Sequence, residues 1–265
     1  MKKLLLAATA LAAIPVVGGW SVGGAQAAVK VQTVQYKQGD TTLEGWLVYD
    51  DAKKGKRPGV IVFPAWNGPD QDAKGRAEML AKLGYVTFVA DVYGKGIRPA
   101  DFKGALAESS KYMKDRGLLR DRAKAAYDQL SKNPMVNASK IAAIGYCFGG
   151  AGALDLARSG APVIDTVTFH GDLTSPTPQD AANIKGRVLV LHGAADPIAG
   201  QKDQDALRNE MNDAHVNWEM VLYGGAVHSF TQKNAGNDPS KGAAYNAYAD
   251  KQSWAEMTRL FHETL

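Results

Sequence analysis

Stretches with the hydrophobic pattern of a strand alternate along this chain with stretches that have the pattern of a helix. Each change from one pattern to the other marks a predicted boundary between elements. Residues 31–37 and 42–49 alternate apolar and polar side chains around Gly39-Asp40, which predicts an antiparallel hairpin at one edge of a sheet. Continuous apolar runs are typical of strands covered on both faces. Such runs predict further strands at 59–63, 85–90, 140–145, 163–169, 187–193 and 216–223.

The segments between these runs carry apolar residues every three or four positions, which predicts helices. We expect helices at 72–83, 102–116, 118–132, 201–214 and 245–264, with the second and third separated by a break at Gly117. Strands that alternate with helices predict one mostly parallel sheet with helices on both faces. No insertion is long enough to form a large lid domain, so residues 28–265 are expected to form a single α/β domain.

The first 27 residues have the pattern of a secretory signal peptide. Lys2 and Lys3 precede an apolar run from Leu4 to Val17, and the segment ends in Ala25-Gln26-Ala27. The run is too short to span a bilayer, and glycines interrupt the residues after it. We therefore expect cleavage after Ala27, a periplasmic or secreted location, and no stable membrane association after cleavage. The alternative is an uncleaved membrane anchor.

Charge and cysteine content narrow the classes of partner. The chain has 31 basic and 27 acidic residues, and two of the basic ones lie in the predicted signal peptide. Basic residues form no stripe interleaved with aromatic ones, so no nucleic-acid partner is expected. Cys147 is the only cysteine, which excludes an internal disulfide.

That cysteine lies in Gly145-Tyr146-Cys147-Phe148-Gly149-Gly150, between a predicted strand and a predicted helical segment at 151–157. The pattern Gly-x-nucleophile-x-Gly predicts a tight elbow that points the middle side chain out over the edge of the sheet. The alternative is a small buried cysteine that packs beside glycines.

Two further residues follow in a meaningful order. Asp196 comes just after the strand at 187–193, and His228 comes just after the strand at 216–223. The order nucleophile, acid, histidine is that of the α/β-hydrolase fold, which predicts a catalytic triad of Cys147, Asp196 and His228. Asp172 is an alternative acid, but its position fits the triad less well.

A triad of this kind needs an oxyanion hole and no cofactor. The backbone N–H of Phe148 and one from the loop at 65–66, most simply that of Trp66, are the expected donors. The five histidines show no metal-binding spacing, so neither a metal nor an organic cofactor is expected.

Other side chains at predicted strand ends are candidates for substrate binding. Trp66, Tyr93 and His170 each follow a strand, where they either line a pocket or belong to the core or to the surroundings of the triad. His192 is expected to pack at a strand end. The remaining histidines, His215 and His262, are expected at the surface.

The motifs together resemble the dienelactone hydrolases, a cysteine-nucleophile branch of the α/β-hydrolases. The matching pieces cover nearly the whole chain after the signal peptide; they are Asp91-Val92-Tyr93, Gly145 to Gly150, His192 to Pro197, and Val227 to Phe230. The resemblance implies Cys147 as nucleophile, His228 as base and Asp196 as the acid that orients it.

Two positions depart from that family pattern. Members that open dienelactone resemble one another in a glutamate where this chain has Ala65, and in an arginine where it has Gln232. Those members also share a second arginine, for which this chain has only Lys95 and Arg98 at positions that match imperfectly. These differences argue against dienelactone itself and favour small to medium neutral esters or lactones as substrates.

The sequence leaves other functions open. The main expectation is an exported carboxylic ester hydrolase acting on a small molecule through a thioester acyl-enzyme. Alternatives are a non-catalytic binding protein on the same fold, or a hydrolase of thioesters, peptides or esterified polysaccharides. The sequence predicts no oligomeric state.

Overall fold

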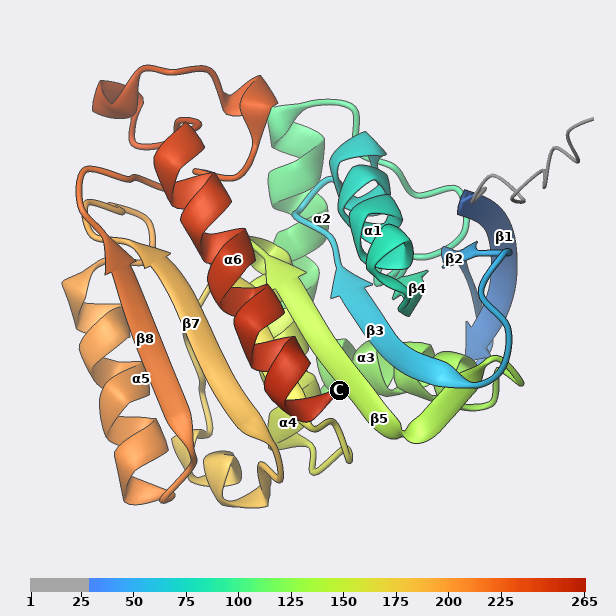
Figure 1. The fold of residues 1–265 in the computed structure, drawn as a ribbon. Helices are drawn as coiled ribbons and strands as arrows, with labels where there is room; N and C mark the ends of the chain where they lie inside the picture. The colour runs from blue at the N-terminus through green and yellow to red at the C-terminus, as the bar shows by residue number, and fades with distance from the viewer. Residues whose placement is uncertain (1–28) are drawn as a thin grey trace, which may run out of the picture.

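The computed structural model describes residues 29–265, which build a single eight-stranded sheet (Figure 1). The predicted signal peptide at 1–27 lies outside the described residues. The strands are β1 (Val29–Gln38), β2 (Thr41–Asp50), β3 (Arg57–Phe63), β4 (Val86–Val89), β5 (Val136–Tyr146), β6 (Asp165–Phe169), β7 (Arg187–Gly193) and β8 (Trp218–Tyr223).

The strand order is β1-β2-β4-β3-β5-β6-β7-β8. β1 and β2 form the predicted antiparallel hairpin at one edge, with Tyr36 opposite Leu43. β2 pairs with β4 in antiparallel fashion, and every later pairing is parallel. The sheet is therefore mostly parallel, as the apolar runs predict.

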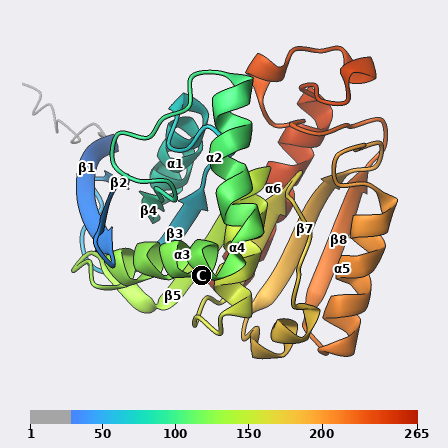
Figure 2. The same cartoon turned by 180° about the vertical axis from the view of Figure 1, so that it is seen from behind.

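Helices cover both faces of the sheet. α1 and α6 lie on one face (Figure 1), and α2, α3, α4 and α5 lie on the other (Figure 2). The helices are α1 (Gln71–Leu83), α2 (Phe102–Lys114), α3 (Arg116–Ser131), α4 (Phe148–Arg158), α5 (Gln201–Asp213) and α6 (Ala247–Thr264). Three short 3₁₀ helices complete the set: η1 (Pro178–Asn183), η2 (Lys233–Ala235) and η3 (Pro239–Lys241).

The central strands divide their apolar side chains between two cores. In β3, Ile61 and Phe63 pack on the face covered by α3 and α4, whereas Val60 and Val62 pack beneath α1 and α6. Successive side chains of a strand point to opposite faces, so an uninterrupted apolar run supplies both cores at once.

The break between the second and third helices does not lie at Gly117, as predicted, but at Asp115. α2 ends at Lys114, and the side chain of Asp115 accepts a hydrogen bond from the N–H of Leu118 at the start of α3. The backbone of Asp115 is non-helical, with φ −117° and ψ 81°, and its side chain caps the new helix, whereas α3 contains Gly117 within its first turn.

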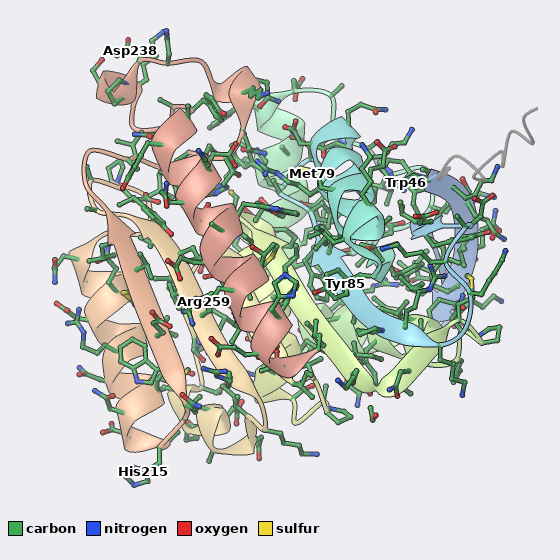
Figure 3. The ribbon with its side chains drawn as sticks, viewed as in Figure 1. Trp46, Met79, Tyr85, His215, Asp238 and Arg259 are labelled. Atoms are coloured by element: carbon green, nitrogen blue, oxygen red, sulfur yellow. The ribbon has the colours of Figure 1, made fainter. Side chains whose placement is uncertain are left out.

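All the parallel strands end at the same edge of the sheet, where the loops after β3, β5, β7 and β8 gather (Figure 1). In Figure 3, Asp238 lies at this edge and His215 lies at the opposite end of the molecule. No helix within residues 29–265 has the length and apolar character needed to cross a bilayer.

Candidate active site

Cys147 occupies a tight turn between β5 and α4. Its backbone has φ 53° and ψ −121°, in a region that residues with a side chain rarely adopt. α4 begins at Phe148, immediately after the cysteine and earlier than the predicted helical segment. The thiol therefore sits at the N-terminus of a helix, where the helix dipole favours an anion.

The flanking glycines are required by close backbone packing. A Cβ on Gly145 would lie 2.0 Å from the carbonyl oxygen of Gly149, and one on Gly149 would lie 2.2 Å from that of Phe63. A Cβ on Gly150 would meet the Cα of Gly171 at 2.5 Å. Helix α4 and the sheet therefore pack so closely around the strained turn at Cys147 that only glycine, which has no side chain, fits at these three positions.

The three predicted triad residues meet in one hydrogen-bonded row. Nε2 of His228 lies 3.0 Å from Sγ of Cys147, and its Nδ1 lies 2.9 Å from Oδ2 of Asp196. His228 and Asp196 are buried, while Cys147 is half-buried. The carboxylate is held in turn, because its Oδ1 accepts hydrogen bonds from the N–H groups of Ile198 and Ala199.

The loop after β8 fixes the backbone of His228. Its N–H donates to the carbonyl oxygen of Gly242 at 3.2 Å, and its own carbonyl accepts from the N–H of Ala244 at 3.0 Å. Ser229 then turns the chain with φ 57°. Residues 229–246 therefore fold back on His228, and two backbone hydrogen bonds from this segment hold the histidine in place.

The charge balance of the row favours a protonated histidine. Burial by itself would lower the pKa of His228, but hydrogen bonds to Asp196 and Cys147 outweigh it and raise that pKa to about 10. Burial would likewise raise the pKa of Asp196, but the hydrogen bond from His228 holds it below its usual value. An imidazolium between a carboxylate and a sulfur is the state that such surroundings stabilise.

Two further histidines, His170 and His192, lie next to the triad residues but do not line the cavity. Nε2 of His192 lies 2.8 Å from the carbonyl oxygen of Ala199 and 3.5 Å from Oδ2 of Asp196. His170 is completely buried, and its Nε2 lies 2.8 Å from Oγ1 of Thr231. Burial lowers the pKa of both rings, so both stay neutral beside a charged neighbour. His215 and His262 are not buried, in line with their predicted place at the surface.

The expected oxyanion donors belong to residues that line the cavity together with Cys147. Phe148 is the first residue of α4, and Trp66 lies in the loop after β3; both line the same cavity as Cys147. Among residues 29–265, neither backbone N–H donates to a protein acceptor. Both N–H groups are therefore free to donate to a bound molecule, as the donors of an oxyanion hole must be.

The cavity above Cys147 has a volume of about 510 Å³. One wall comes from α2 through Phe102, Leu106 and Met113, and the remainder comes from the loops at the strand ends. Asp172 and Lys241 also line it, one acidic and one basic. The sequence predicts a helix at 102–116, but it does not predict that apolar residues of this helix line a cavity.

Three of the four side chains expected around the substrate do not line this cavity. Trp66 does. Tyr93 is buried behind it and donates from its hydroxyl to the carbonyl oxygen of Trp66 at 2.7 Å. His170 is enclosed behind His228, and Arg98 is bound by the carbonyl oxygens of Glu44 and Ile97 and by Asp91. Their positions at strand ends are as expected, but their polar groups are directed into the protein.

Asp172 and Lys95 are also placed. Asp172 accepts hydrogen bonds from the N–H and hydroxyl of Thr174, and is not bonded to His228. Lys95 is half exposed and lies 4.0 Å from Glu44, outside the cavity lining. Within the described part of the chain, no group of three or more His, Cys, Asp or Glu side chains is arranged to hold a metal ion.

The two residues that depart from the family pattern line the same small pocket. Ala65 and Gln232 line it together with Arg76 and Tyr146. The Arg76 guanidinium donates to the carbonyl oxygen of Thr231 at 2.8 Å and to Asp250 at 2.6 Å. This basic side chain is therefore already hydrogen-bonded to protein oxygens.

Comparison with known proteins gives a consistent result. The dienelactone hydrolase family is matched over residues 43–265. The solved structure of a protein named m3DLH is 41% identical, with a TM-score of 0.86, and the match covers 90% of this chain and 99% of that one. A dienelactone hydrolase-like promiscuous phosphotriesterase from metagenomic libraries is 42% identical, with a TM-score of 0.85 over 89% of this chain and 99% of its own.

A curated relative extends the comparison. A Synechocystis protein named as a candidate carboxymethylenebutenolidase is 25% identical over 253 residues, which are 89% of this chain and 98% of the relative. These similarities confirm the predicted α/β-hydrolase fold and the resemblance drawn from the motifs.

Proposed function

This chain belongs to the dienelactone hydrolase family and is a hydrolase of ester bonds, and on that premise we propose that Cys147, His228 and Asp196 are its catalytic triad. The observation that carries the proposal is the row from Sγ of Cys147 through His228 to Asp196, with contacts of 3.0 and 2.9 Å. Asp196 holds the imidazole in the useful tautomer and stabilises its charged form.

In the first step the Cys147 thiolate attacks the carbonyl carbon of the ester, forming a carbon–sulfur bond. The tetrahedral intermediate collapses with cleavage of the ester carbon–oxygen bond, and the leaving alkoxide takes a proton from His228. Water, deprotonated by the now neutral His228, then attacks the thioester. The carbon–sulfur bond breaks, and the carboxylic acid leaves as the thiolate and the imidazolium are restored.

The negative oxygen of both tetrahedral intermediates would be held by the N–H groups of Phe148 and Trp66. The peptide that carries the Trp66 N–H is held by its carbonyl oxygen, that of Ala65, which accepts from the N–H of Gly68 at 3.0 Å. The Tyr93 hydroxyl holds the next peptide of the loop through the Trp66 carbonyl oxygen. Loss of one such donor costs about 10²–10³ in rate.

We propose small to medium neutral esters or lactones as substrates. A carboxylate-bearing substrate needs a fixed cation, and Arg98 and Arg76 are both bound by protein oxygens. Lys241 lines the cavity, but its side chain is 76% exposed and lies 3.9 Å from Asp238, so it is not a fixed cation for a substrate. Gln232 supplies only a neutral amide where a bidentate arginine would fit a carboxylate.

The test is a library of neutral esters, together with matched esters that bear a free carboxylate, on the protein without residues 1–27, with Cys147→Ala as the control. We expect hydrolysis in the parent and none in the variant. Activity retained in Cys147→Ala would refute the triad. A preference for carboxylate-bearing esters over matched neutral ones would refute the proposed substrate class. A binding protein without activity, or one specific for thioesters, peptides or esterified polysaccharides, would hydrolyse no ester in the library.

A second candidate activity is hydrolysis of neutral phosphate triesters, which the name of the 42% identical neighbour suggests. Attack of the thiolate would form a phosphorus–sulfur bond and expel an aryl oxide, and water would then cleave the phosphorus–sulfur bond. A diethyl aryl phosphate assayed beside an aryl ester tests it. No release of the aryl alcohol from the phosphate, or equal release by Cys147→Ala, would remove this candidate.

We also propose that the protein is exported and cleaved after Ala27. The support is the basic start, the apolar run and the Ala25-Gln26-Ala27 ending of the sequence. N-terminal sequencing of protein from the cell envelope should begin at Ala28. Recovery of chains that retain Met1 in the cytoplasm would contradict export.

A further inference from the structure

Helix α2 turns one face toward the cavity above Cys147. Phe102, Leu106, Ser110 and Met113 line the cavity and recur every three or four residues, which places them along one side of the helix. An adjoining side of the helix packs into the protein through Ala105 and Tyr112. The apolar residues of α2 are therefore divided between a buried side and a side that faces the substrate cavity.

The cavity side of α2 is left uncovered. Phe102 is 69% exposed and Leu106 is 48% exposed. Ile198, from the loop that follows Asp196, is 63% exposed and lines the same cavity. Trp66 meets the Phe102 ring edge to face, with ring centroids 5.1 Å apart. A cluster of large, solvent-exposed apolar side chains around a cavity indicates a binding site for an apolar ligand.

The helix is held in place by groups other than these side chains. The side chain of Asp101 caps its first turn by accepting from the N–H of Gly104 at 2.7 Å. The Tyr112 hydroxyl donates to the carbonyl oxygen of Tyr93 at 3.0 Å. Phe102 and Leu106 are thus displayed on a helix whose attachment does not depend on them.

We propose that the ester substrate carries an apolar substituent, aryl or medium-chain alkyl, which packs on Phe102, Leu106 and Met113. The inference rests on the proposed ester hydrolysis and names the part of the substrate that α2 selects. A cavity of about 510 Å³ lies within the range that holds a ligand of this size. Each methylene buried on this wall should raise kcat/KM by about fourfold until the wall is covered.

The experiment compares two ester series in the parent. One varies the acyl chain from acetyl to octanoyl on a fixed 4-nitrophenol, and the other varies the alcohol on a fixed acetyl group. We expect kcat/KM to rise at least tenfold along one series, and Phe102→Ala with Leu106→Ala to remove most of that rise. Leu83→Ala is the matched control, since Leu83 is also 48% exposed but lies on α1 outside the cavity lining. The control should keep the full rise.

Failure of the inference and failure of the proposed function give different results. A flat response in both series, or a rise that survives in the double variant, overturns the role of α2 while ester hydrolysis stands. Absence of all hydrolysis overturns the proposed function. In that case calorimetry on Cys147→Ala still tests the wall, because the octanoyl ester should bind at least tenfold more tightly than the acetyl ester. Equal affinities would overturn the apolar site as well.

Discussion

The rings of His170 and His228 meet edge to face with centroids 5.3 Å apart, yet the fold drives their protonation in opposite directions. Burial, together with the neighbouring charge of His228, lowers the pKa of His170 well below its ordinary value. Hydrogen bonds to Asp196 and Cys147 raise the pKa of His228 to about 10 despite its burial. The neutral ring can therefore pack against the charged one without repelling it.

Replacing His170 should change the acid stability of the protein. A buried neutral histidine takes up its proton only on unfolding, so its contribution to stability is lost as the pH falls below about 6.5. In His170→Phe the aromatic packing against Phe230 is kept and the titrating group is gone. We expect the melting temperature of the variant to fall less than that of the parent between pH 7.5 and 5. The surface residue His215 offers a control, since His215→Phe should follow the parent, and an equally steep fall in His170→Phe would contradict the assignment.

The contact between Cys147 and His228 predicts rapid alkylation. A charged imidazole 3.0 Å from Sγ stabilises the thiolate, which is the reactive form. Iodoacetamide should label Cys147 quickly at neutral pH, and His228→Ala should slow labelling at least tenfold. Mass spectrometry of timed samples measures both rates. His262→Ala serves as the control because that ring is exposed at the C-terminal helix; matching rates in all three proteins would argue against the ion pair.

Two glycine-to-alanine substitutions should have opposite effects. In Gly149→Ala the new Cβ would lie 2.2 and 2.4 Å from the carbonyl oxygens of Phe63 and Pro64, so β3 and α4 must separate. We expect a loss of about 3 kcal/mol in the free energy of unfolding and a large loss of activity. Gly75→Ala, within α1, meets no atom within 4 Å and should stabilise by about 0.5–1 kcal/mol. Urea unfolding of both variants measures the difference, and a Gly149→Ala protein as stable as the parent would contradict the packing argument.

Asp165 predicts a second pH dependence, of opposite sign to that of His170. Burial raises its pKa to about 6, although Thr264 donates a hydrogen bond to it. The native state then binds the proton more tightly than the unfolded state, so stability falls as the pH rises from about 4 through 6. Asp165→Asn should remove this fall and gain on the order of 2–3 kcal/mol at pH 7. Urea unfolding at pH 4, 5, 6 and 7 tests it; a parent slope that persists in the variant would show that another group is responsible.

Much of the fold could be predicted because its determinants are local. Gly145, Gly149 and Gly150 specify the elbow through backbone contacts that exclude any Cβ, and this requirement is visible in the sequence. The positions of Asp196 and His228 follow from chain order and from the rule that parallel strands end at one edge. The hairpin of β1 and β2 follows from strict alternation around a turn.

The surroundings of the site depend on packing that the sequence does not display. A helix with a given apolar stripe can bury it or turn it toward a cavity, and in α2 Phe102 and Leu106 do the latter. Arg98 follows a strand end as a substrate-binding arginine would, but carbonyl oxygens from β2 and its own loop bind it. The acceptor on Glu44 lies 54 residues away in the chain, so no local pattern reveals it.

The proposed nucleophile, acid and base all follow β5 in the chain, whereas the apolar wall of the cavity comes from α2, between β4 and α3. Substitutions can therefore accumulate on the wall without displacing the atoms that react. Related enzymes can then evolve different substrate specificities while they keep the same chemistry. For directed evolution of substrate specificity, α2 is therefore the segment to randomise.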